Sequence, residues 1–479
     1  MTCATTTVAA PASVPARTAR PRVVLVALAA AGLAVSVQQT LVIPLIPRLM
    51  TGFGVSVAAV TWVFTASLLA GAVATPLLTR FGDLYGKKRM VLAALGLLLA
   101  GSVVCALSSS LPVLVAGRAL QGTSAALVPL AIGMIRDAFP PARVTTAIGV
   151  VSATMGVGGT IGMIVTGVIA DRTPSHRPVF WIAAGLAVAV LVLVAVATPD
   201  TGERPGGRPD LLGAALLAVW LVCLLLGISQ GNRWGWTSAG VLGLFAAAAA
   251  LCAVWTVAQR RTARPLVRLG LLVGPRSLGA NTASALLGFS MFAAFTLIAG
   301  FVQAPRAQAG YGMSGSVLDV GLYMLPSTVT MLGCSLVTGR ATARFGAAYT
   351  LAAGAATAAA SYVWLAVAND RPLDVLAFSA IQGAGFGIAY AALGTLAVQH
   401  VPMGQSGIAS GINSLVRTTG GSVAGAVTAA ILTASTLDGT ALPSRAAYEL
   451  CFWVIAAGAA LAALVAAAAG LRHRALPVP

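Results

Sequence analysis

Charged residues are scarce in this chain of 479 residues: Asp, Glu, Lys and Arg together make up only 8% of it. A soluble domain carries about 25% charged residues, so the composition excludes an ordinary soluble enzyme. Apolar residues make up 58% of the chain, and about 20 consecutive apolar residues are enough for a helix to cross a bilayer. The composition therefore predicts an integral membrane protein with many spanning helices and the lipid bilayer as its surroundings.

Residues that carry metal, redox or nucleotide chemistry are also few. The three histidines (His176, His400 and His473) lie far apart, and none of the six cysteines forms a C-x-x-C pair. The chain has no G-x-x-x-x-G-K-[ST] stretch, which would bind the phosphates of ATP. Clustered acids, histidines or Ser–Lys pairs at one depth, which a membrane-embedded enzyme would need, are missing too. We therefore expect no enzyme, no catalytic residues, no metal site and no cofactor.

Spanning-length apolar runs define the organisation of the chain. Fourteen such runs occur, at about residues 23–46, 57–79, 90–108, 111–133, 145–170, 178–198, 211–230, 237–258, 278–303, 317–339, 349–368, 374–398, 405–433 and 446–470. The joint around Ser108–Ser110 is the shortest. An even number of spans places both termini on the same side of the membrane.

The chain is basic, with a formal charge of +18, and the position of this charge indicates orientation. With the N-terminus inside, 20 of the 29 Lys and Arg residues fall on the cytoplasmic side, seven fall outside, and Arg118 and Arg417 lie within spans. Cytoplasmic segments of membrane proteins carry such an excess. We expect both termini in the cytoplasm of a bacterial cell, in a multi-pass protein of the plasma membrane, and no nucleic-acid partner.

An internal repeat orders the fourteen spans. Ala119-Leu-Gln121-Gly122 recurs as Ala380-Ile-Gln382-Gly383, and Arg80-Phe-Gly82 recurs as Arg344-Phe-Gly346. The copies are eight helices apart, an even number, so they have parallel topology. The repeat predicts an all-α integral membrane protein with two parallel six-helix bundles and two inserted helices. The expected parts are a disordered cytoplasmic tail (1–22), a first bundle (23–198), the inserted pair (211–258), a second bundle (278–470) and a tail (471–479).

The joint between the second and third spans is a candidate gate. It reads Thr79-Arg-Phe-Gly-Asp83-Leu-Tyr-Gly86-Lys87-Lys88-Arg89. Glycine permits the tight turn, and an acid beside a basic cluster can hold two helix ends together through charge-assisted hydrogen bonds. The alternative is a solvated basic loop that only sets orientation. The C-terminal copy has Ala347 where Asp83 would be.

Two arginines inside spans are candidate functional residues. An arginine at mid-membrane costs about 2.5–3.5 kcal/mol on insertion scales, so Arg118 and Arg417 should face the protein interior or a water-filled cavity. Gln121 and Gln382 beside the repeat motif either line that cavity or bond neighbouring helices. Aromatic residues that could shape a cavity are scattered, and they are Trp62, Phe64, Phe289, Phe292, Tyr323 and Tyr390.

Two further segments carry candidate residues. Gly158 and Gly162 belong to a glycine-rich fifth span, where small residues let helices pack closely and form a pliable interface. Gln38 and Thr40 in the first span supply hydrogen-bonding groups for a substrate, or else pack against other helices.

On these motifs the chain resembles the major facilitator superfamily, specifically the fourteen-helix branch of drug:proton antiporters. The family loop G-x-L-a-D-r-x-G-r-k is matched by Asp83, Gly86, Lys87 and Lys88, with Thr79 in place of its first glycine. The exporter motif G-P-x-x-G-G is matched at Gly158 and Gly162 but lacks its proline. The resemblance implies a part in proton transfer for Arg118, whose position carries an arginine in the family.

The first span departs from that family. Thr40 matches the pattern L-D-x-T, but Gln38 stands where the family has a membrane-embedded acid, and glutamine cannot bind and release a proton. No acid lies in the middle of a span. Asp319 is the first candidate proton carrier, aided by Arg118, although a helix-capping role for it is equally compatible with the sequence. Two buried arginines without such an acid favour a neutral or anionic substrate.

The expected function is secondary active export of hydrophobic or amphipathic small molecules, such as antibiotics, by alternating access with proton antiport. The protein is expected to act as a monomer. A lipid or amphipath transporter without proton coupling, or a solute importer of the same fold, are the alternatives. A channel would more naturally assemble from identical subunits, and it would not explain the parallel repeat.

Overall fold

The computed structural model describes residues 21–475 except 43–44, 56, 174, 200–209, 264, 275–276, 400, 403–404, 438–439 and 441. Of the two expected tails, residues 1–20 and 476–479 lie outside the described residues, whereas 21–22 and 471–475 belong to helices. Within the described residues the chain forms helices and no strand, apart from one isolated bridge between Thr436 and Pro443. In the part of the chain that the structure describes, fourteen helical spans are long and apolar enough to cross a membrane, as the sequence predicted.

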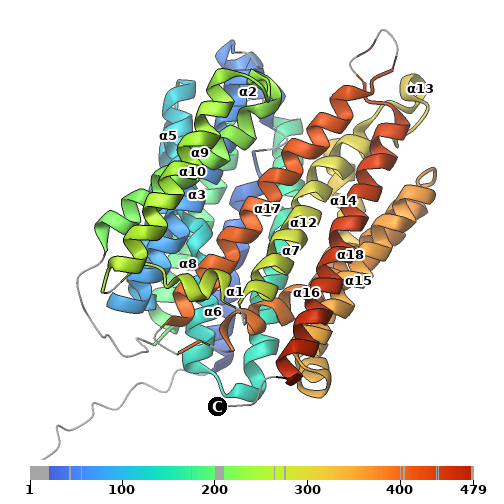
Figure 1. The fold of residues 1–479 in the computed structure, drawn as a ribbon. Coiled ribbons are helices and arrows are strands. Elements are labelled where there is room, and N and C mark those ends of the chain that lie inside the picture. Colours follow the sequence, from blue (N-terminus) through green and yellow to red (C-terminus); the bar gives the residue numbers. More distant parts are fainter. Residues whose placement is uncertain are drawn as a thin grey trace, which may run out of the picture.

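The order of the helices along the chain can be followed in Figure 1. The long ones are α1 (Pro21–Thr40), α3 (Val57–Tyr85), α4 (Lys87–Leu107), α7 (Pro141–Arg172), α8 (Arg177–Ala197), α9 (Leu211–Trp234), α10 (Ala239–Arg261), α12 (Leu278–Gln303), α14 (Val317–Phe345), α15 (Ala347–Val367), α16 (Pro372–Val398), α17 (Ser406–Ala434) and α18 (Arg445–Ala475). The fourth span is divided into α5 (Leu111–Gly122), a 3-10 turn η2 (Thr123–Ala126) and α6 (Leu127–Ala138). Short helices are α2 (Ile46–Phe53), α11 (Leu269–Val273) and α13 (Arg306–Ala309).

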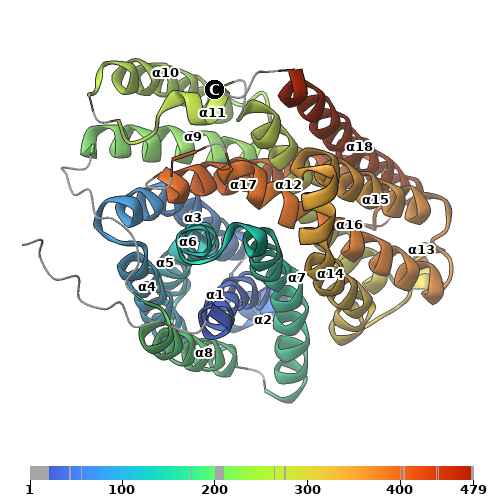
Figure 2. The same cartoon turned by 90° about the horizontal axis from the view of Figure 1, so that it is seen from below.

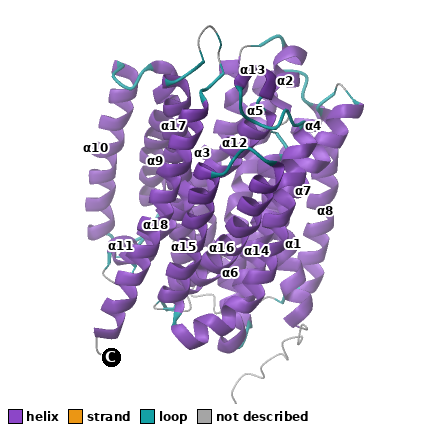
Figure 3. Ribbon diagram, turned by 90° about the vertical axis from the view of Figure 1, so that its right-hand side faces the viewer, coloured by secondary structure: helices purple, strands orange, loops and turns teal. Residues whose placement is uncertain are grey.

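The short joint at Ser108–Ser110 separates two helices. Helix α4 ends at Leu107, and α5 begins at Leu111 with a proline at its start, where a missing N–H costs no helical hydrogen bond. The start of α1 and the end of α18 lie at the same end of the molecule (Figure 3). We call this the terminal end and the opposite one the distal end.

The helix packing of the first six spans recurs in the last six. In the first set, α1 packs on α7, α5 packs on α3 and α4, and α4 packs on α8. In the second set the corresponding pairs are α12 with α17, α16 with α14 and α15, and α15 with α18. Helices α9 and α10 pack against each other at one edge, where α9 contacts α3 and α17 (Figure 2).

The repeated Gln-Gly motif sits at equivalent helix contacts in the two sets. A side chain added at Gly122 would collide with the carbonyl oxygen of Ser67 on α3, and one at Gly383 would collide with that of Ser327 on α14. Both glycines therefore allow the backbones of crossing helices to approach closely. The need for this close approach explains why the glycine recurs at the same place in both sets of helices.

Candidate functional site: a terminal lock and a central cavity

The candidate gate loop turns sharply at the terminal end. Gly86 has φ 109° and connects α3, which ends at Tyr85, directly to α4, which begins at Lys87. Residues with a side chain rarely adopt this backbone conformation, so glycine is needed here. The turn places Asp83 and Lys87 side by side at the ends of two helices.

Asp83 binds the start of α17, which belongs to the second set of helices. Its carboxylate accepts hydrogen bonds from the backbone amides of Gly407 and Ile408 at 3.1 and 2.8 Å. Free amides and the positive end of the helix dipole make a helix N-terminus a good binding place for an anion. Among the described residues Asp83 is the only acid that is fully buried, at 3% exposed. The acid is thus committed to a contact between the two sets of helices.

Lys87 completes this contact. Its Nζ lies 3.3 Å from Oδ1 of Asp83 and 2.6 Å from Oδ2 of Asp137 at the end of α6. Arg136 donates to the carbonyl oxygen of Val401, just before α17. We call Asp83, Lys87, Asp137, Arg136 and the start of α17 the terminal lock. These contacts join the two sets of helices at the terminal end.

Lys88 has a different role from Lys87. Its Nζ donates to the carbonyl oxygens of Ala195 and Thr198, at 2.8 and 2.6 Å, at the end of α8. A cation is favourable at the C-terminal end of a helix, where carbonyl groups lack partners. Lys88 therefore holds helices of the first set together and does not reach the second set.

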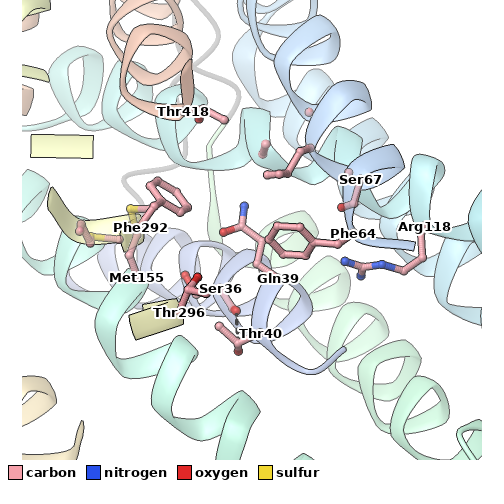
Figure 4. Close-up of a pocket in the computed structure, with 15 residues that line it drawn as sticks. Ser36, Gln39, Thr40, Phe64, Ser67, Arg118, Met155, Phe292, Thr296 and Thr418 are labelled. Carbon is pink, nitrogen blue, oxygen red and sulfur yellow. Dashed lines mark hydrogen bonds between the residues drawn. The ribbon is translucent and has the colours of Figure 1, made fainter. Parts of the chain in front are cut away.

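A cavity of about 80 Å³ lies between the two sets of helices, further from the terminal end. Its lining residues come from α1, α3, α5, η2, α7, α12 and α17 (Figure 4). The polar lining residues are Ser36, Gln39, Thr40, Ser67, Thr296, Thr418 and Arg118, and the large apolar ones are Phe64, Leu68, Met155, Met291 and Phe292. The only charged residue in this lining is Arg118.

Gln38 takes the helix-packing role that the sequence left open, and its neighbour Gln39 lines the central cavity instead. Gln38 is buried and donates to the hydroxyl of Ser67 at 3.2 Å, whereas Gln39 lies on the cavity wall between Phe64 and Phe292 (Figure 4). Successive residues of an α-helix point about 100° apart, and on α1 the side chains of Gln39 and Thr40 face the cavity whereas that of Gln38 faces Ser67. Thr40 does line it, and its hydroxyl donates to the carbonyl oxygen of Gly159.

Arg118 lies at the edge of the cavity, fully buried, and is held by neutral acceptors. Its guanidinium donates to the carbonyl oxygens of Val63 and Gln38, both at 3.1 Å, and to the side-chain oxygen of Gln121 at 2.7 Å. Gln121 in turn donates to Ser102 on α4 at 2.8 Å. Gln121 therefore takes the second of its two predicted roles, because its amide bonds Arg118 and the neighbouring helix α4 and does not line the central cavity.

Gln382, the repeat counterpart of Gln121, is not a cavity residue either. It donates to the hydroxyl of Tyr362 on α15 at 3.0 Å, which is a bond between neighbouring helices. The sequence left this alternative open for both glutamines. The structure assigns it to both.

Arg417 is buried, but it does not line the cavity. Its guanidinium carbon lies 5.3 Å from the ring centroid of Tyr390, within the range of a cation–π contact, and it donates to Ser414 at 2.9 Å. The next residue, Thr418, lines the cavity instead. The sequence therefore indicated that α17 contributes to the cavity, but not which face of α17 points toward it.

Asp319 caps the distal end of α14. Its carboxylate accepts from the amide and hydroxyl of Ser316 at 2.7 and 2.9 Å, and its own amide donates back to that hydroxyl. This is a capping box, which stabilises a helix start. Asp319 is not among the residues that line the central cavity.

Gly158 and Gly162 lie where α7 crosses α1. A side chain at Gly158 would collide with Ser36, and one at Gly162 would collide with the hydroxyl of Thr40. Both partners line the central cavity, so the glycines set how closely α7 approaches the cavity wall.

Three comparisons with known proteins bear on this architecture. The model of a family described as Major Facilitator Superfamily matches residues 28–426. The chain is 28% identical over 437 residues to a protein of Mycobacterium tuberculosis (strain CDC 1551 / Oshkosh) named as an MFS-type transporter, and the match covers 89% of the chain but only 62% of that relative. It is 29% identical over 417 residues to the tetracenomycin C resistance and export protein of Streptomyces glaucescens, covering 85% of the chain and 75% of that protein.

A solved structure is similar in fold. The human organic anion transporter MFSD10 superposes with a TM-score of 0.67, covering 93% of this chain and 99% of that one at 15% identity. At this identity the likeness concerns the fold alone.

Proposed function

The chain belongs to the major facilitator superfamily, and on that basis we propose that it exports neutral or anionic amphipathic small molecules by alternating access. The observation that carries the proposal is the lining of the central cavity. It combines aromatic and methionine side chains with neutral polar groups and one arginine, and it contains no acid.

The size of the cavity supports alternating access. Pockets for drug-sized ligands measure about 300–1,000 Å³, whereas the central cavity measures about 80 Å³ in this conformation. The two sets of helices must therefore separate to admit such a molecule. The terminal lock joins the two sets at one end, so its breakage is the step that opens the cavity there.

The charge of the cavity determines which substrates it favours. A cation 6 Å from Arg118 would be repelled by about 3 kcal/mol at an effective dielectric constant of about 20, and an anion would be attracted by as much. A neutral amphipath can use Gln39, Thr296 and Thr418 for hydrogen bonds and the two phenylalanines for apolar contact. A relative named for tetracenomycin C resistance and export supports outward transport.

We propose proton antiport as the energy source. Protonation of Asp83 would remove its negative charge and weaken its bonds to Gly407, Ile408 and Lys87. A proton that reaches Asp83 from the distal side and leaves to the terminal side would couple its passage to opening of the terminal lock, and this route uses no acid in the lining of the central cavity. Asp319, with its carboxylate in the cap of α14, is not needed in this route.

Transport by purified protein in lipid vesicles tests the proposal. A panel of amphipathic compounds is offered with a pH gradient imposed or collapsed by an ionophore. Gradient-dependent movement of neutral and anionic compounds is the expected result, and Thr418→Trp should abolish it by filling the cavity. Thr357→Trp, at a half-buried threonine on α15 that does not line the central cavity, is the matched control. Movement that ignores the gradient would reject proton antiport, and movement in the opposite direction would favour a solute importer.

A further inference from the structure

Two further cavities lie between α9, α10 and α11 on one side and α3, α12 and α17 on the other. Figure 2 shows how these helices are arranged at the edge of the molecule. One is a small polar pocket at the terminal end, and the other is a larger apolar cavity of about 380 Å³. Neither shares a lining residue with the central cavity. The proposed transport cycle leaves both without a role.

The polar pocket brings two arginines together. Arg80 from α3 and Arg268 from the segment before α11 line it with Gln405. Among the described residues, neither guanidinium has an acid within ion-pair distance, and Asp83, one helical turn from Arg80, is already bound by Lys87 and α17. Two positive charges in one pocket repel each other unless an anion lies between them. The pocket is therefore suited to an anionic group.

The segment that carries Arg268 is held in place by buried polar contacts. Asp210 caps α9 and also accepts from the side-chain amide of Gln259 at 2.7 Å and from the amide of Leu266 at 3.3 Å. Gln259 accepts from the amide of Val267 at 3.0 Å. The pocket wall is thus fixed by these bonds before any ligand binds.

The apolar cavity lies deeper in the membrane region. Nearly all its lining side chains are hydrocarbon or aromatic, including Trp220, Trp255 and Phe289. The indole N–H of Trp255 donates to the carbonyl oxygen of Gly213, but the buried N–H of Trp220 has no acceptor among the described residues. A buried donor without a partner is unfavourable. An apolar ligand with an oxygen acceptor would satisfy it.

The two cavities are stacked along the same helices. Arg80 and Pro76 are four residues apart on α3, as are Ile408 and Ile412 on α17, and in each pair one residue lines the polar pocket and the other the apolar cavity. Four residues of α-helix correspond to about 6 Å. A molecule with an anionic head and an apolar tail can therefore occupy both.

We propose that this composite site binds an anionic phospholipid, with its phosphate between Arg80 and Arg268 and an acyl chain in the apolar cavity. Val423, which lines the cavity, is 37% exposed, so a chain can enter from the bilayer. Basic pockets between membrane helices bind anionic lipid headgroups. An ester carbonyl of the lipid supplies the acceptor that Trp220 lacks.

Fluorescence quenching by brominated lipids tests the site. The protein is placed in nanodiscs that contain brominated phosphatidylglycerol, which is anionic, or brominated phosphatidylcholine, which is zwitterionic. We expect stronger quenching by the anionic lipid, and we expect Trp220→Phe with Trp255→Phe to remove the difference. Arg80→Gln with Arg268→Gln should abolish the preference, whereas Arg340→Gln with Arg344→Gln, which removes equal charge at the end of α14, should retain it.

The single variant Arg268→Gln separates loss of lipid binding from misfolding, because this side chain is exposed and its replacement should not disturb the fold. It should weaken the preference in protein whose thermal unfolding is unchanged. Equal quenching by both lipids in the unaltered protein would show a cavity for any apolar chain and would overturn the proposal. A preference that survives loss of both Arg80 and Arg268 would overturn it as well. Neither outcome depends on transport.

Discussion

Asp83→Asn should open the terminal end of the protein. The carboxylate accepts two backbone hydrogen bonds from α17 and lies 3.3 Å from Lys87. Hydrogen bonds to a charged group contribute about 1.5–3 kcal/mol each. The side-chain oxygen of asparagine can still accept from one of the two amides of α17. Its NH₂ group would face the other amide, which is also a donor, and Lys87 would lose its ion pair with residue 83. The locked state should therefore lose about 2–4 kcal/mol, which shifts the ratio of locked to open molecules by about 30- to 1,000-fold.

Distance measurements between spin labels can follow this change. Arg89 at the start of α4 and Phe345 at the end of α14 are exposed, lie at the terminal end and belong to different sets of helices. Each is replaced by a labelled cysteine in a variant without the six native cysteines. The Asp83→Asn protein should show a new, longer population of distances between the two labels.

Two control variants test whether loss of the Asp83 contacts causes the longer distances. Asp137→Asn removes the contact to Lys87 at 2.6 Å but leaves both bonds from α17 to Asp83, so its effect should be smaller. Asp374→Asn removes a carboxylate that caps the distal end of α16 and should leave the terminal distance unchanged. If Asp83→Asn gave the same distance distribution as the unaltered protein, the contacts of Asp83 would not hold the terminal end closed.

Further predictions concern stability. Arg118→Gln leaves buried acceptors without a donor at about 1–3 kcal/mol each, so we expect a lower unfolding temperature together with loss of transport in vesicles. Gly383→Ala should destabilise the protein by about 1–3 kcal/mol through overpacking, whereas Gly333→Ala, which meets open space, should leave thermal unfolding unchanged. Hydrogen bonds from Arg445 lower the pKa of Asp370, so this pair stabilises the fold above the carboxyl's ordinary pKa of about 3.9 and the effect is lost as pH falls through the lowered pKa. Asp370→Asn should remove that acid-dependent loss, which is about 0.2–1 kcal/mol for such an exposed pair, in unfolding scans from about pH 6 down to about pH 2.

The sequence was sufficient to predict the spans and the charged turn that contains Asp83 and Lys87, but not the contacts of Arg136 and Asp137. Each apolar run that is long enough to cross the bilayer predicts one spanning helix, so the number of runs predicts the number of helices. The spacing of Asp83, Gly86 and Lys87 implied a tight charged turn, and the structure has one. The partner of Asp83 could not be predicted, because it is the backbone of α17 and any residue type provides backbone amides.

Helix rotation is the main reason why the cavity residues were missed. The first span is apolar on nearly all faces, so its pattern does not show which face meets the cavity, and Gln38 was chosen where Gln39 lines the wall. Arg417 and Thr418 differ in the same way. The cap at Asp319 could have been recognised, because Ser316 stands three residues before it at the start of an apolar run.

The most direct test of the central claim uses three compounds with the same apolar body and an anionic, a neutral or a cationic head. Their transport into or out of vesicles is measured for the unaltered protein. We predict that the anionic and neutral members are transported and that the cationic member is transported poorly, because Arg118 is the only charged residue in the lining of the central cavity. Preferred transport of the cationic member would contradict this account of the cavity.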